Sequence, residues 1–157
     1  EQVKELAPTH IIISPGPGNP SNERDFGICS SILQNVSQLS SKILGVCLGH
    51  QGIVHHAGGR VIKAPIPVHG KTSPLRILRS SKLFEGVTDG SRVMRYHSLI
   101  ADRAAIPESL EIIADESETS LVMAVQSKCQ KVFGVQFHPE SIATVDGKKI
   151  VENFLSI

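Results

Sequence analysis

The sequence predicts an α/β fold, with an open, mostly parallel sheet, helices on both faces and a small antiparallel excursion. Apolar, β-branched runs at 9–14 and 42–46 are each followed by a glycine-containing turn and then a helical pattern. Two strand–helix alternations in succession are typical of a parallel sheet covered by helices. Beyond residue 60, short apolar runs separated by polar turns indicate antiparallel pairing. A chain of 157 residues suits one domain with a substantial core.

The elements follow in order along the chain. The first strand (9–14) ends where Ser14 opens the string SPGPGNP, because alternating proline and glycine cannot continue a strand. A helix is predicted over 24–39, where apolar residues recur at helical spacing, and a second strand over 42–46. The next helix begins after Cys47 and ends near Gly58. Shorter strands are expected at 60–63, 74–78, 91–96, 110–114, 121–126 and 132–137, and a closing helix at 148–155.

The central candidate is Cys47, which stands between Gly45 and Gly49 at the end of the second predicted strand. The same spacing around a serine forms the nucleophile elbow of hydrolases, a sharp turn that presents the reactive atom. If a helix starts here, its unpaired N–H groups and its dipole favour the thiolate over the thiol. The alternative is a buried structural cysteine, because free cysteine is often buried. The elbow alone leaves both interpretations open.

His138 and Glu140 are the candidate partners of this thiol. Pro139 favours extended geometry at His138, and residues i and i+2 of an extended segment project to the same side. His138 can then act as a base while Glu140 fixes its tautomer and charge. A lone His-Pro-Glu is more often a surface loop, but its combination with a glycine-flanked cysteine favours a catalytic set.

The loop at 14–20 supplies a candidate oxyanion hole. Attack of a cysteine on an amide creates an oxyanion that needs two convergent N–H donors. Gly16 and Leu48, from two loops at the same end of the sheet, are the natural pair, whereas Pro17 has no N–H to donate. The loop lacks the Gly-Lys-Ser/Thr ending of a phosphate-binding loop.

Four motifs occur in a fixed order: SPGPG at 14–18, GVCLGHQ at 45–51, RYHSL at 95–99 and GVQFHPES at 134–141. With them the chain resembles the class I, triad-type glutamine amidotransferases over essentially its whole length. The resemblance implies Cys47 as nucleophile, His138 as base and Glu140 as its partner. It implies Gly16 and Leu48 as the oxyanion donors, and Gln51 as the residue that holds the amino-acid end of glutamine. The full set of implied substrate-binding residues is Pro15, Gly16, Gly18, Gln51, Ser98 and Leu99.

The chain looks most like the glutaminase subunits or domains of chorismate-using synthases. The resemblance implies that ammonia passes to a chorismate-binding synthase, either a separate subunit or a fused domain, and that the glutaminase step needs no cofactor. The string APIPVHGK at 64–71 favours aminodeoxychorismate synthase, of the folate pathway, with anthranilate synthase, of the tryptophan pathway, as the alternative. Family members carry a further strand and helix upstream, so we expect residues 1–157 to be an N-terminally truncated glutaminase domain with an unpaired sheet edge.

Two other functions stay open at this stage. One is a non-hydrolysing regulatory module that docks on a synthase. The other is a cysteine peptidase or another acyl-transferring thiol enzyme with the same triad. An intact set of Cys47, His138 and Glu140 argues against the first.

The remaining histidines and the composition restrict the possible functions of the chain. His97 is expected to shape the glutamine pocket rather than act as the base, His69 to lie in a solvated turn, and the adjacent His55 and His56 to bind no metal. The formal net charge is +1 and the 16 Lys and Arg residues are scattered, which argues against a nucleic-acid or membrane surface. Three cysteines without metal-ligand spacing favour a reducing compartment, and hence the cytoplasm or, in a plant, the plastid.

Overall fold

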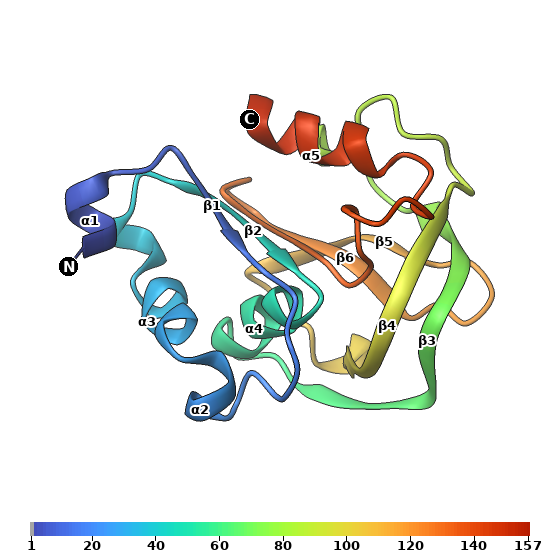
Figure 1. Cartoon of the computed structure of the whole chain (residues 1–157), viewed down its shortest axis with the longest axis horizontal. Helices are drawn as coiled ribbons and strands as arrows, with labels where there is room; N and C mark the ends of the chain where they lie inside the picture. Colours follow the sequence, from blue (N-terminus) through green and yellow to red (C-terminus); the bar gives the residue numbers. More distant parts are fainter. Residues whose placement is uncertain (1) are drawn as a thin grey trace.

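One mixed sheet of seven strands runs through the computed structural model, which describes residues 2–157 (Figure 1). Its strand order is β1-β2-β7-β6-β5-β3-β4. The pairs β1–β2 and β2–β7 are parallel, whereas β7–β6, β6–β5, β5–β3 and β3–β4 are antiparallel. The strands are β1 (His10–Ile13), β2 (Lys42–Val46), β3 (Val61–Ile77), β4 (Arg92–Ala101), β5 (Leu110–Glu116), β6 (Val122–Ser127) and β7 (Val132–Val135).

Helices lie on both faces of this sheet, and the predicted α/β class is confirmed (Figure 1). On one face, Phe154 of α5 packs in a buried cluster with Phe133 of β7. On the other face, Phe26 of α2 and Ile53 of α4 share a second buried cluster with Ile43 of β2. The helices are α1 (Gln2–Leu6), α2 (Glu23–Phe26), α3 (Ile28–Gln34), α4 (Leu48–His56) and α5 (Gly147–Ser156), with short 3-10 turns η1 (Val36–Gln38), η2 (Lys82–Phe84) and η3 (Arg103–Ala105).

The prediction of one continuous helix over 24–39 is wrong. The segment is divided into α2, α3 and η1, and the first break falls at Gly27, whose φ of 51° and ψ of −133° lie outside the helical region. Apolar spacing alone does not register such a break, because Phe26 before it and Leu33 after it are buried in the same cluster. Gly27 therefore decides where the helix stops.

The strands expected at 60–63 and 74–78 are parts of one long strand, β3. Register shifts between Lys63 and Val68, and between His69 and Lys71, bend this strand along its pairing with β4. The proline-containing stretch between them thus belongs to the sheet as an irregular portion rather than to a loop. The bend brings His69 opposite Tyr96.

The register of the parallel strands positions the candidate site. Ile13 pairs with Gly45, and Val46 pairs with Val135, so β1, β2 and β7 end at nearly the same level. The segments that follow these strands carry Gly16, Cys47 and His138, respectively. Carboxyl ends of parallel strands are where open α/β sheets bind their ligands. The prediction that these loops share one end of the sheet is confirmed.

Candidate active site

Cys47 occupies a sharp strand-to-helix turn. It is the residue immediately before α4, and its φ of 52° and ψ of −99° are strained for a residue with a side chain. A Cβ added to Gly45 would lie 2.4 Å from the carbonyl carbon of Gly49, and one added to Gly49 would lie 2.4 Å from the carbonyl oxygen of Ile13. Both glycines are therefore required by close backbone approach, as the sequence predicted.

The protonation state of Cys47 differs from the prediction. Burial raises the pKa of the thiol to about 11, and the negative charge of Glu140 adds to this rise. The Leu48 N–H at the start of α4 and the Gln136 side chain lower the pKa, but burial outweighs them. The helix terminus thus does not make Cys47 a thiolate at neutral pH. Consistent with a thiol, Sγ lies 3.9 Å from the Tyr96 carbonyl oxygen, which can only accept a hydrogen bond.

His138 and Glu140 form the pair that the His-Pro-Glu spacing predicted. The distance from His138 Nδ1 to Glu140 Oε1 is 2.7 Å. The backbone N–H of His138 donates to the carbonyl of Met94, and the hydroxyl of Thr144 donates to the carbonyl of His138, which fixes this segment beside β4. Among the described residues, the buried Nε2 of His138 has no hydrogen-bond partner. A neutral ring that donates from Nδ1 to Glu140 leaves Nε2 free to accept a proton.

Tyr96 connects the thiol to the histidine. Its carbonyl lies beside the Cys47 sulfur, and its ring packs edge-on against the His138 ring with a centroid separation of 5.2 Å. Sequence reasoning did not assign this residue, although it stands inside the RYHSL motif. Strand β4 alternates its side chains between the two faces, so Tyr96 is half-exposed while its neighbours Arg95 and His97 are buried.

A cavity of about 170 Å³ opens at the thiol. Gly16, Gly18, Gln51, Ser98 and Leu99, which the resemblance implied for glutamine, line it, whereas Pro15 and Leu48 do not and Pro17 does. His69, Tyr96 and His97 line it as well: the full set is Gly16, Pro17, Gly18, Cys47, Gln51, His69, Tyr96, His97, Ser98 and Leu99. The cavity is bounded by the first loop, the start of α4 and strands β3 and β4.

His69 is a site residue that sequence reasoning placed in a solvated turn. Its Nε2 lies 2.9 Å from the Ser98 hydroxyl, and both residues line the cavity. The contact follows from the β3–β4 register, which puts His69 opposite Tyr96. This pairing is long-range and depends on the bulges of β3, so no local pattern in the sequence could have revealed it.

The two candidate oxyanion donors are neighbours in space. A Cβ on Gly16 would lie 3.1 Å from the Leu48 side chain, so the loop at 14–20 rests directly on the start of α4. Asp25 holds this loop by accepting a 2.9 Å hydrogen bond from the Asn19 N–H. Gly16 lines the cavity, and within residues 2–157 its N–H donates to no backbone carbonyl. It is available to a bound oxygen.

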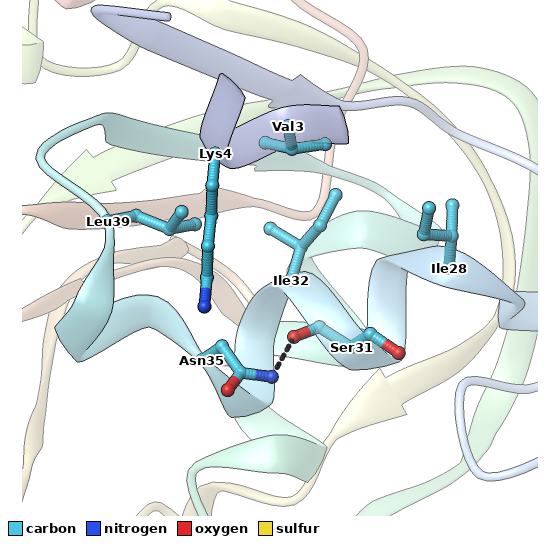
Figure 2. Close-up of a pocket in the computed structure, with 7 residues that line it drawn as sticks. All are labelled: Val3, Lys4, Ile28, Ser31, Ile32, Asn35 and Leu39. Carbon is cyan, nitrogen blue, oxygen red and sulfur yellow. Dashed lines mark hydrogen bonds between the residues drawn. The ribbon is translucent and has the colours of Figure 1, made fainter. Parts of the chain in front are cut away.

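A second cavity, of about 310 Å³, lies between α1 and α3 and is lined by Val3, Lys4, Ile28, Ser31, Ile32, Asn35 and Leu39 (Figure 2). Its lining contains no cysteine and no histidine, and its one lysine donates to Gln38. In the part of the chain that the structure describes, no group of His, Cys, Asp and Glu could hold a metal ion. No helix of that part has the length and apolar character needed to cross a membrane.

The fold and these side chains together have the layout of an α/β enzyme that works through a thiol. The chain belongs to the class I glutamine amidotransferase family, because residues 1–157 match the family described as "Glutamine amidotransferase class-I". The protein is therefore a class I glutamine amidotransferase.

Named relatives agree with this assignment. The chain is 45% identical over 155 residues to "Anthranilate synthase component 2" of Methanothermobacter marburgensis, covering 99% of this chain and 76% of the relative. It is also 45% identical to "Bifunctional protein TrpGD" of Thermotoga maritima, of which it spans 26%. Among solved structures, a Thermoplasma acidophilum protein described as part of a GMP synthase superposes with a TM-score of 0.84 at 25% identity, over 99% of this chain and 74% of that one.

Proposed function

We propose that this protein is the glutaminase component of anthranilate synthase. It hydrolyses glutamine to glutamate and ammonia, and the ammonia goes to a chorismate-binding synthase. The names of its relatives support this alternative over aminodeoxychorismate synthase, which the string at 64–71 favoured. The observation that carries the glutaminase activity is the position of Cys47, whose sulfur opens into a cavity lined by Gly16, Gln51 and Ser98.

The first step is attack of the Cys47 sulfur on the side-chain amide carbon of glutamine. Because burial keeps Cys47 a thiol, its proton must leave as the S–C bond forms, and the free Nε2 of His138 is the acceptor. The N–H groups of Gly16 and Leu48 hold the oxyanion that develops. Glu140 accepts from Nδ1 and stabilises the imidazolium that results.

Breakdown of this intermediate uses the same groups. His138 returns the proton to the departing nitrogen, so that ammonia leaves and a thioester remains on Cys47. His138 then takes a proton from water as the water attacks the thioester, and glutamate leaves when the sulfur regains its proton. The substrate's amino-acid end lies toward Gly18, Gln51, Ser98 and Leu99, which line the same cavity as the thiol.

An exposed apolar surface beside the histidine supports a partner that covers the site. Ile142 and Val145 follow the His-Pro-Glu segment, are strongly exposed, and line a surface hollow together with Glu140. Exposed apolar side chains beside a site are typical of a protein interface. A chorismate-binding synthase seated there would receive ammonia without its release to solvent.

Product analysis tests the proposal. The protein is combined with the chorismate-binding subunit of its own organism, glutamine and chorismate, and the products are separated. Anthranilate that depends on glutamine and on Cys47 is the expected result. Formation of 4-amino-4-deoxychorismate instead would overturn the assignment to anthranilate synthase. Absence of Cys47-dependent glutamate from the complex would overturn the glutaminase itself.

A further inference from the structure

A buried amide that does not line the cavity lies beside the reacting sulfur. Gln136 follows β7, is fully buried, and is held by a backbone hydrogen bond from its N–H to the Met123 carbonyl. Its Nε2 lies 3.7 Å from Cys47 Sγ. Neither the triad nor the oxyanion hole includes this residue.

Its amide orientation is fixed by a chain of hydrogen bonds that begins at a backbone carbonyl. Leu99 O can only accept, and it lies 2.9 Å from one atom of the Gln51 amide, which is therefore Nε2. The same nitrogen lies 3.2 Å from Gln136, so the Gln136 atom there is Oε1. The NH₂ group of Gln136 is left facing the sulfur. The assignment of nitrogen and oxygen in both amides thus follows from the chemistry of their neighbours.

His97 fixes the beginning of this chain. Its Nδ1 lies 3.1 Å from Leu99 O, and its Nε2 lies 3.0 Å from Arg95 Nε, which can only donate. The ring is therefore the neutral tautomer with its proton on Nδ1. Burial, and then the charge of Arg95, lower the pKa of His97 to about 3, so this state persists at all ordinary pH values. Leu99 O receives two donors and cannot turn away from Gln51.

We propose that Gln136 is a further catalytic residue, whose side-chain N–H donates to the Cys47 sulfur and stabilises the negative charge that the sulfur gains when its proton leaves. Gln51 is then a positioning residue as well as part of the substrate pocket, because it holds the Gln136 amide in the donating orientation. A hydrogen bond to the ionised form favours that form. The inference adds a residue to the site of the proposed function and rests on that function, but its effect on the thiol is measurable without glutamine.

The test is the rate of Cys47 alkylation as a function of pH, in the protein with Cys29→Ser and Cys129→Ser so that no other thiol reacts. Gln136→Met keeps the side-chain length and removes the donor. Between pH 6 and pH 9, well below the thiol pKa, we expect Gln136→Met to react about tenfold more slowly than the parent, since loss of one such hydrogen bond raises the pKa by about one unit. The factor should be the same for iodoacetamide and for the bulkier N-ethylmaleimide, because ionisation of the sulfur affects both equally.

Two further variants keep the test decisive. Gln136→Glu preserves the shape and the acceptor for Gln51 but replaces the NH₂ group by an oxygen, and it should also slow alkylation at least tenfold. Gln126→Met removes another buried amide, which contacts Ser81 before η2 and Glu111 on the neighbouring strand β5, and should leave the rate within about twofold of the parent. Rates of both Gln136 variants that equal the parent's would overturn the inference, as would a factor that differs between the two electrophiles. If alkylation is slowed but the protein does not hydrolyse glutamine, the proposed function is refuted, and the stabilisation of the Cys47 thiolate by Gln136 is still shown.

Discussion

Two buried histidines should make the stability of the protein strongly pH-dependent. Burial lowers the pKa of His50 to about 4, and burial together with the charge of Arg95 lowers that of His97 to about 3, from an ordinary value of 6.5. Neither ring nitrogen of His50 makes a hydrogen bond of good geometry in the described part of the chain, and the nearby Gly134 backbone offsets only part of the effect of burial on the pKa. The unfolded chain therefore binds two protons that the native state excludes.

The sign and size follow from linkage. Both native pKa values lie below the unfolded value, so the stabilisation is present above about pH 6.5 and is lost as the pH falls toward the native values. Each histidine changes the free energy of unfolding by about 1.4 kcal/mol per pH unit inside that window. Between pH 6.5 and pH 4.5 the loss is about 2 kcal/mol for each, and about 4 kcal/mol together.

The assay is urea unfolding at pH 6.5, 5.5 and 4.5, comparing the protein with its His50→Leu variant. Leucine fills similar space and leaves no unpaired nitrogen, so the variant should lose about half of the histidine contribution to the slope of stability against pH. Carboxylates contribute equally to both proteins and cancel in the comparison. Parallel slopes for the two proteins would refute the argument that His50 is held neutral by burial.

Three other substitutions test the elbow and the triad. The free energy of unfolding of Cys47→Gly, measured by calorimetry, should be about 1 kcal/mol higher than that of Cys47→Ala, because only glycine adopts the positive φ of this position without strain. Equal free energies for the two variants would contradict the strain. Gly45→Ala should cost at least about 2 kcal/mol in urea unfolding, since its Cβ meets the Gly49 backbone at 2.4 Å, and a neutral substitution would contradict that contact. Glu140→Gln should lower kcat for glutamine about 100-fold, through loss of support for His138, while it speeds alkylation of Cys47, whose pKa the carboxylate raises. A fall in both rates would show that Glu140 acts otherwise.

The geometry of the site could be predicted from local patterns where the backbone itself imposes it. Gly45 and Gly49 predicted the elbow, and the His-Pro-Glu spacing predicted the pairing of His138 with Glu140, although this segment is a turn closed by the Ser141 N–H on the His138 carbonyl rather than the expected extended segment. Gln136 was missed: it follows β7 directly, and its contact with Cys47 joins residues 89 positions apart, which no local pattern shows.

Other features depend on tertiary structure. The protonation state of Cys47 could not be predicted, because the helix terminus is a local signal, whereas the burial that outweighs it comes from a tertiary cluster with Val93 of β4 and Val135 of β7. The place of His69 in the pocket depends on the bulged register of β3 against β4. The break at Gly27 depends on a non-helical backbone conformation of this one residue, which the helical spacing of the apolar residues on both sides does not show.

The central claim is that Cys47 hydrolyses glutamine. Its most direct test is steady-state glutamate and ammonia production from glutamine by the complex with the chorismate-binding subunit, for the native protein and for Cys47→Ser. We predict turnover by the native complex and a loss of at least about 1,000-fold in the variant, since the covalent route is closed without the thiol. Equal rates for the two complexes, or no turnover by either, would contradict the account.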